Sequence, residues 1–183
     1  MVYQCQDFSY EVMRKRVKHM TIRITPKAEV TVTVPLRCPE RQIREFVAAK
    51  SGWVRRHLAE MEKKQVIFVQ DITFGKVEEE ELLALVRVYL PAFAPYHVME
   101  PQIRFRRMKS RWGSCNKTRG TITLNKALCM VPQECRIYVV VHELAHLVEM
   151  NHSAAFYRVV ENVLPEYKNY EKRLRQYALQ DEK

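Results

Sequence analysis

Apolar residues dominate residues 135–150 on almost every side of the helix that their spacing describes. A helix that is apolar all round is typical of the interior of a domain. Pro132 suits the first turn of such a helix, and the polar Gln133 and acidic Glu134 that follow suit its positive end. The pattern therefore predicts a buried helix over residues 132–150.

Strict alternation of apolar and polar residues predicts β-structure near the N-terminus. Residues 10–13 alternate, and residues 21–25 and 30–34 alternate with β-branched side chains on both sides of a predicted turn at 26–29. The last two segments are expected to form a hairpin with one apolar and one polar face.

Helical spacing returns after Pro39. An apolar stripe over residues 43–61 predicts a helix with a break or bend at Ser51 and Gly52, and residues 66–69 suggest a short strand. The acidic run 78–81 suits the start of a second helix, which Pro91 and Pro95 should kink or stop. Strands are predicted at residues 103–106 and 121–125, paired as a hairpin around a basic loop, and further helices at 153–160 and from Glu166.

The predicted buried helix contains the sequence His142-Glu143-Leu144-Ala145-His146. Histidines four residues apart on a helix project from the same face, so their two imidazoles can bind one tetrahedral zinc ion. The glutamate between them is then placed to act on a metal-bound water. Because buried histidines need a partner, these residues are candidate metal ligands, with Glu143 as the catalytic carboxylate.

His152 is the candidate third ligand, separated from His146 by five residues. The same interval occurs in the pattern HExxHxxGxxH, where a glycine lets the chain turn back to the metal. Glu149 stands at that glycine position here, so we expect Asn151, which tolerates left-handed backbone, to make the reversal. Glu161 or Glu166 would be the third ligand in a site with two histidines and one glutamate.

The length of 183 residues suits one domain, or one domain with a substantial appendage. We expect residues 1–75 to form an N-terminal hairpin and helix, followed by a metal-binding domain at 76–183. The formal charge of +10 favours anionic partners. Five cysteines without a Cys-x-x-Cys pair argue against a zinc ribbon and for reduced thiols in the cytoplasm. No stretch approaches membrane-spanning length, so no membrane partner is expected. The oligomeric state is not predicted.

Several of these motifs together resemble the YgjP-like family of zinc-dependent hydrolases, which are related to SprT-like proteases and minimal zincins. The resemblance rests on residues 110–115, on Leu124-Asn125, on the histidine motif through Leu147, and on residues 151–153 with Phe156. It implies an α+β, zincin-like metallopeptidase domain with a small sheet, an active-site helix and a packing helix. It also implies one Zn²⁺ per chain held by His142, His146 and His152. The segment 65–75 is shorter than is usual in the family.

A zinc peptidase with Glu143 as general base is therefore the predicted activity, and a peptide or protein is the predicted substrate. Arg111, Tyr157 and Tyr167 are candidate oxyanion donors, while Arg111, Asn125 and Tyr157 are candidate substrate-binding residues. Glu149 and Asn125 are candidate hydrogen-bond partners of the imidazoles. An extended peptide is expected to add a strand beside residues 121–125. Cys115 is expected to be a buried thiol.

Two alternatives keep the same metal. One is a nucleotide or phosphoester hydrolase, because basic residues precede the metal motif at Arg104, Arg106, Arg107, Lys109, Arg111, Lys117 and Arg119. The other is a protease associated with nucleic acid, as the SprT-like resemblance suggests, although aromatic residues are not interleaved with these basic residues.

Overall fold

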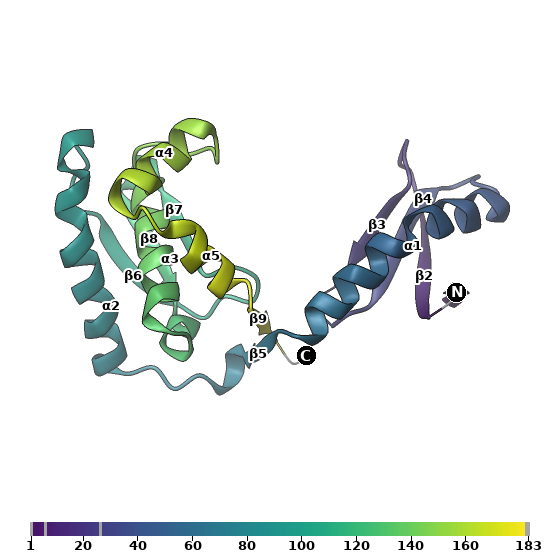
Figure 1. The fold of residues 1–183 in the computed structure, drawn as a ribbon, viewed down its shortest axis with the longest axis horizontal. Helices are drawn as coiled ribbons and strands as arrows, with labels where there is room; N and C mark the ends of the chain where they lie inside the picture. Colours follow the sequence, from purple (N-terminus) through teal and green to yellow (C-terminus); the bar gives the residue numbers. More distant parts are fainter. Residues whose placement is uncertain (1, 6, 26, 182–183) are drawn as a thin grey trace. The chain divides into compact units, whose positions relative to one another are not determined.

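The computed structural model describes residues 2–5, 7–25 and 27–181, and the chain forms two compact units, Met1–Lys64 and Gln65–Lys183. Each unit has its own hydrophobic core. Strand β5 (Gln65–Phe68) belongs to the second unit because it pairs in parallel with β9 (Tyr177–Gln180) from the other end of the chain (Figure 1). The boundary predicted at residue 75 differs from this division because no local sequence pattern predicts the pairing of residues 65–68 with β9.

The N-terminal unit consists of a four-stranded sheet and one long helix. Its sheet has the order β1-β2-β4-β3, in which β2 and β4 are parallel and the other pairs are antiparallel. The elements are β1 (Val2–Cys5), β2 (Phe8–Lys15), β3 (Thr21–Ile24), β4 (Val30–Pro35) and α1 (Glu40–Glu62).

The predicted hairpin of this unit is confirmed, since β3 and β4 are antiparallel with Ile22 opposite Val32. Pro26 of the predicted turn lies outside the described residues. Alternate side chains of β4 are buried, and they form one apolar cluster with the stripe of α1 that includes Val47 and Val54. Burial of this shared face holds the helix against the sheet.

Helix α1 runs without a break through Ser51 and Gly52, so the chain stays helical at the position of the predicted break or bend. The Ser51 hydroxyl donates a hydrogen bond to the Ala48 carbonyl at 2.8 Å, within the helix itself. Glycine inside a helix costs about 1 kcal/mol. The fully buried Val47 and Val54 on both sides of this position outweigh that cost.

The second unit is built on helices and a three-stranded sheet of order β6-β8-β7. Its further elements are α2 (Lys76–Tyr89), β6 (Gln102–Arg106), β7 (Gly113–Asn116), β8 (Thr121–Asn125), α3 (Gln133–Ala145), α4 (Ala154–Val163) and α5 (Tyr167–Leu174). Short 3₁₀ helices cover Val69–Asp71, Leu90–Tyr96, Lys117–Arg119 and Lys126–Met130. Helix α2 ends just before Pro91, as its sequence predicts. In the part of the chain that the structure describes, no helix is both long and apolar enough to cross a membrane.

The predicted hairpin between residues 103–106 and 121–125 is wrong. Strands β6 and β8 are parallel, with Phe105 beside Leu124, and the hairpin partner of β8 is β7. Strand β7 lies within the predicted basic loop, where a glycine and polar residues hide the alternation that usually marks a strand. As a result β8 is the central strand, and its two edges are already paired.

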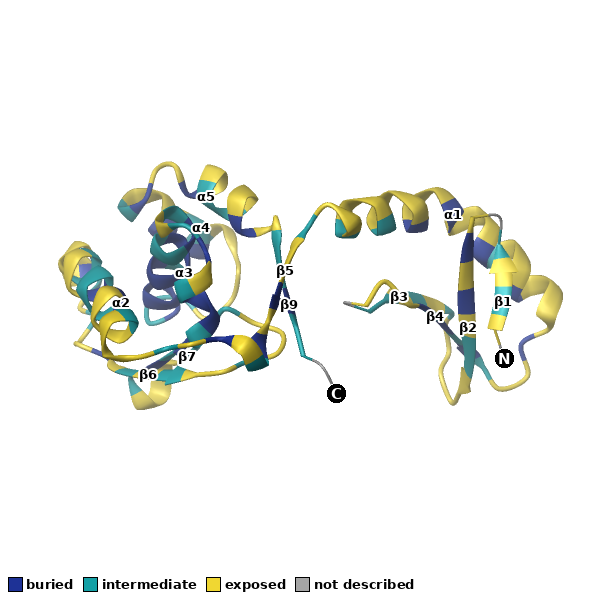
Figure 2. Ribbon diagram, turned by 90° about the horizontal axis from the view of Figure 1, so that it is seen from below, coloured by how far each residue is buried: buried dark blue, intermediate teal, exposed yellow. Residues whose placement is uncertain are grey.

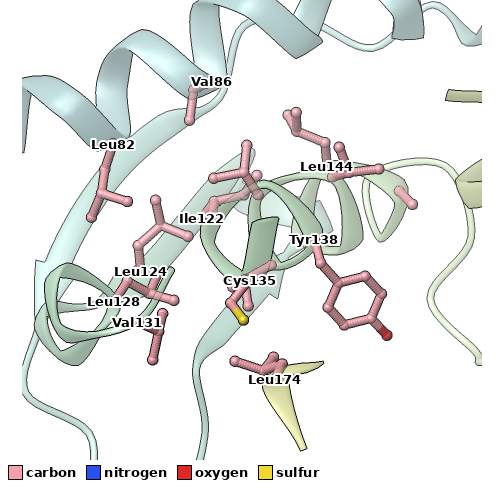
Figure 3. Close-up of a cluster of buried hydrophobic side chains, with 14 of the residues drawn as sticks. Leu82, Val86, Ile122, Leu124, Leu128, Val131, Cys135, Tyr138, Leu144 and Leu174 are labelled. Carbon is pink, nitrogen blue, oxygen red and sulfur yellow. The ribbon is translucent and has the colours of Figure 1, made fainter. Parts of the chain in front are cut away.

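Helix α3 is the centre of the second core, and it is buried along most of its length (Figure 2). Figure 3 shows Leu82 and Val86 of α2, Ile122 and Leu124 of β8, and Leu174 of α5 around it. Val139, Val140, Val141 and Leu144 are each 3% exposed or less. The prediction of a buried helix is therefore confirmed, although the α-helix ends at Ala145 rather than at Met150.

Asn125, fully buried at the end of β8, fixes the loop between β6 and β7. Its amide nitrogen donates to the carbonyls of Met108 and Arg111, at 2.7 and 2.8 Å. Its side-chain oxygen accepts from the backbone of Met108 and of Ala127. One side chain thus satisfies four backbone groups.

Replacing Asn125 by Ala should lower the free energy of unfolding of this unit by about 3 kcal/mol, because buried backbone groups lose their partners. Urea unfolding in a Trp53→Phe background, where Trp112 fluorescence reports the second unit, measures the change. Thr123→Ala, on the same strand, should have a much smaller effect. Equal stability of the two variants would contradict this role of Asn125.

Candidate metal centre

The end of α3 positions three of the predicted site residues. His142 and Glu143 lie in its last turn, and His146 caps the helix one turn later, with its backbone N–H bonded to the His142 carbonyl. Because residues four apart lie above one another on a helix, the imidazoles of His142 and His146 share one side of α3. Their ring centroids are 4.8 Å apart.

The segment after α3 brings His152 back to the same side. Tight turns follow Ala145, whose carbonyl accepts hydrogen bonds from Val148 and Glu149. The Glu149 carboxylate then accepts a hydrogen bond from the Asn151 backbone at 3.1 Å. Asn151 was expected to adopt left-handed backbone, which is wrong, because its φ is not positive. The Glu149 side chain instead braces the reversal.

The three imidazoles converge through the same ring atom. His142 Nε2 lies 3.2 Å from His146 Nε2 and 3.0 Å from His152 Nε2. Nitrogen ligands at the distances and tetrahedral angles that zinc prefers are about 3.3 Å apart. The donor atoms therefore already have approximately the separation that a single zinc ion requires.

A hydrogen bond determines which ring nitrogen of His146 faces His142 and His152. Its Nδ1 lies 3.1 Å from the Glu149 carbonyl oxygen. A carbonyl can only accept, so Nδ1 carries the proton and Nε2 presents its lone pair. The predicted partner residue Glu149 is thus present, but it acts through its backbone. His142 Nδ1 is buried and has no hydrogen-bond partner among the described residues.

Phe156 packs under the three imidazoles. Its ring centroid lies 4.9, 4.5 and 4.9 Å from those of His142, His146 and His152. The side chain is fully buried, and α4 presents it after Ser153, whose hydroxyl accepts the Phe156 N–H as the helix cap. This apolar contact restricts the rotation of every ring in the cluster.

Exposure of the histidines increases across the cluster, because His146 is 8% exposed, His142 is half-buried and His152 is exposed. Burial, and secondarily the other two histidines, lowers the pKa of His142 to about 3. Burial also lowers the pKa of His146. Both imidazoles are therefore neutral at physiological pH, as a metal ligand must be, and the His152 side of the cluster is accessible to solvent.

Glu143 packs against the sheet, where its carboxylate lies next to Gly113 of β7. Its side chain is 5% exposed, and its Oε2 has no hydrogen-bond partner within the described part of the chain. Burial raises the pKa of this carboxyl group to about 8, and the positive charge of Arg111 opposes the shift. Glu143 is thus a carboxyl group whose affinity for a proton is unusually high.

Gly113 of β7 makes room for this carboxylate. A Cβ atom at Gly113 would lie 2.5 Å from Glu143 Oε1 and 2.6 Å from its Cγ. Cβ atoms in proteins essentially never make nonbonded contacts that short, so only glycine fits here without displacing Glu143. No local sequence pattern predicts this role, although Gly113 is one of only four glycines in the chain.

Only some of the other predicted site residues lie near Glu143 or the histidines. Arg111 is exposed and close enough to influence Glu143, while Tyr157 is half-buried and stacks on Tyr167. Asn125 bonds backbone groups, as described above. Cys115 lies half-buried on β7, and burial raises its pKa to about 11, so its thiol is protonated at neutral pH. The exposed Glu161 and Glu166 do not belong to the histidine cluster.

Two solved structures are similar to about half of this chain. The chain is 31% identical to the metallopeptidase zymogen abylysin of Pyrococcus abyssi over 54% of this chain and 98% of that one, with a TM-score of 0.45. It is 22% identical to the zymogen jannalysin of Methanocaldococcus jannaschii over 52% and 94%, with a TM-score of 0.44. No curated protein matches the chain.

A family model describes most of the sequence. The model of the YgjP-like metallopeptidase domain matches residues 18–89 and 75–177, which include the three histidines, Glu143 and most of the N-terminal unit. The resemblance inferred from the sequence motifs is thereby confirmed, as is the α+β fold class. This chain belongs to the YgjP-like metallopeptidase family and is a hydrolase.

Proposed function

We propose that this chain is a zinc-dependent peptidase in which His142, His146 and His152 hold one zinc ion and Glu143 is the general base. The observation that carries the proposal is the convergence of three Nε2 atoms, with the two distances to His142 at 3.0 and 3.2 Å. Three protein ligands leave a fourth position open, which is the arrangement of catalytic rather than structural zinc sites.

The donor set favours zinc among divalent metals. Imidazole suits zinc, whereas magnesium and calcium prefer oxygen ligands. The proton fixed on Nδ1 of His146 leaves the Nε2 lone pair of that residue available to a metal. When bound, zinc supplies a Lewis acid that polarises the substrate carbonyl and lowers the pKa of a coordinated water.

Glu143 performs the proton transfers in this proposal. Its Oε2 accepts a proton from the attacking water and returns it to the nitrogen of the leaving amine. Burial raises the pKa of this carboxyl group and so increases its basicity, while Arg111 limits the rise. Arg111 and Tyr157 are the proposed contacts of the substrate oxyanion, since their side chains carry donors and are not fully buried.

Strand β7 is the proposed docking edge for the peptide backbone. Strand addition at β8, expected from the sequence, is wrong because β6 and β7 occupy both of its edges. Strand β7 pairs only with β8 within the described part of the chain, and its Gly113 adjoins Glu143. A peptide lying along β7 would bring its own carbonyl groups near the general base.

The basic loop gives little support to a phosphoester substrate or to a nucleic-acid-associated activity. Arg107 donates to the Ile72 carbonyl, Lys109 pairs with Asp181, and Lys117 donates to the Val148 carbonyl. These side chains hold the fold together rather than surround the histidines. Of the basic residues in this loop, Arg111 is the one whose charge acts on Glu143.

Glu143→Gln should retain one zinc per chain and reduce peptide hydrolysis by about 10²–10⁴-fold, the usual contribution of a general base. Hydrolysis of a quenched fluorescent peptide library, together with elemental analysis of the same protein, tests this. Glu161→Gln, a change of the same type at an exposed position, should retain activity. Full activity in Glu143→Gln would remove Glu143 from the mechanism.

Alanine at His142, His146 or His152 should lower the affinity for zinc by more than 10–100-fold. A loss of 10–100-fold is typical when only the hydrogen-bond partner of a metal ligand is removed. Competition with a chromogenic chelator measures the affinity. His97→Asn is the matched control, because His97 has a left-handed φ of 55° that asparagine tolerates. Unchanged zinc affinity in any of the three alanine variants would exclude that residue as a ligand.

Gly113→Ala should retain zinc and lower kcat by about 100-fold, because displacing a catalytic group by about 1 Å has an effect of that size. The new methyl group pushes on Glu143 without touching the histidine ring atoms. Gly75→Ala, in the same unit, is the control, since a Cβ there meets its nearest neighbour at an ordinary 3.4 Å. Loss of zinc from Gly113→Ala would show that the glycine supports the ligands instead.

A further inference from the structure

The N-terminal unit has an unpaired sheet edge. Strand β3 ends the sheet order and pairs with β4 alone among the described strands. The Thr25 backbone N–H donates to the Glu29 carbonyl and continues this antiparallel ladder. Because bonded positions alternate along an antiparallel strand, Thr21 and Arg23 bond toward β4, whereas the backbone groups of Ile22 and Ile24 face outward. An unpaired strand edge is a template for another strand.

A groove lies beside this edge, between β3 and α1. It has a volume of about 750 Å³, and its lining includes Met20, Ile22, Phe46, Lys50, Trp53 and Arg56. All of these residues belong to the N-terminal unit. A groove between an edge strand and a helix is where several domains bind extended peptides, with the strand bonding the backbone and the groove receiving alternate side chains.

The floor of the groove is an incompletely covered part of the core. Met20, Ile22 and Phe46 pack against the buried cluster and yet are only partly buried themselves. The Trp53 side chain is 42% exposed, and its indole stacks on the imidazole of His57 at 5.1 Å. An apolar partner seated here would remove indole and phenyl surface from water.

Charge specifies the partner further. Residues 1–64 contain fourteen Lys and Arg against seven Asp and Glu, so this unit carries +7 of the chain's +10. Three of its seven acidic groups, Glu40, Glu45 and Asp7, already pair with arginines of α1. Lys50 and Arg56, which line the groove, form no ion pair with the described residues. The groove therefore suits a partner with negative charge beside apolar groups.

We propose that the β3 edge and this groove bind an extended acidic polypeptide as an additional strand. One apolar side chain of the polypeptide packs against Trp53 and Phe46, and its acidic side chains approach Lys50 and Arg56. Self-association through β3 is opposed by the like charge of two such units. Single-stranded nucleic acid is bound mainly by stacking on aromatic faces, and one face of Trp53 is occupied by His57. The binding surface does not depend on the zinc site.

The experiment uses the full chain carrying Glu143→Gln, so that the probe is not cleaved. The probe is a fluorescein-labelled peptide whose odd positions are Leu and Glu in turn and whose even positions are Thr, so that apolar and acidic side chains share one face of the strand. Anisotropy measures its binding. Saturable binding is expected, weakened about tenfold or more by Trp53→Ala and by Lys50→Glu with Arg56→Glu. Arg37→Glu with Lys63→Glu makes the same charge change at exposed positions outside the groove and should weaken binding much less. Equal loss in both double variants would overturn the proposal.

The backbone contact is tested without altering the protein. Two series of peptides are used, one N-methylated at odd positions and one at even positions. Each series loses the N–H groups along one edge of the extended peptide only. One series should bind about tenfold or more weakly and the other normally, because only one side of an added strand bonds to β3. Equal binding of both series would contradict strand addition. Tighter binding of an oligothymidylate at the same surface, or a dimer that Ile22→Lys abolishes, would overturn the choice of partner.

Discussion

Burial of α3 is the constraint on which the proposed metal centre depends. The helix carries His142 and Glu143 in its last turn, and side chains of β8, α2 and α5 belong to the core around it. A helix packed on so many sides cannot rotate or slide without opening cavities in the core. The directions of the first two imidazoles are therefore set by apolar contacts elsewhere along α3, and only His152 depends on the turn that follows. Phe156 then connects this third ring to the same core.

The same burial gives the site its chemical character. Removing a carboxyl group from water raises its pKa, and removing an imidazole lowers its pKa, so one environment makes Glu143 basic and keeps His142 neutral. Each of these groups would destabilise an ordinary core. Their presence in the most buried helix of the unit indicates a functional rather than a packing role.

How much of this was predictable depends on how local the determining interactions are. The histidine spacing, the buried helix and the β3–β4 hairpin follow from periodicity within short segments, and those predictions were right. The parallel pairing of β6 with β8, and β7 inside a polar loop, depend on contacts between distant segments that no local pattern encodes. Gly113 and the backbone role of Glu149 were missed because they act through space and main chain, neither of which a residue type reveals.

The parallel pairing of β5 with β9 has a topological consequence. Gln65 lies beside Tyr177, and its N–H donates to the Gln176 carbonyl at 2.8 Å, so the catalytic unit begins and ends at one place. The pairing of β5 with β9 thus brings the two ends of this unit together. A circular permutation that joins these ends by a short linker and opens new termini in an exposed turn would keep the packing around α3. The hydrolase unit is accordingly suited to insertion into an unrelated host protein.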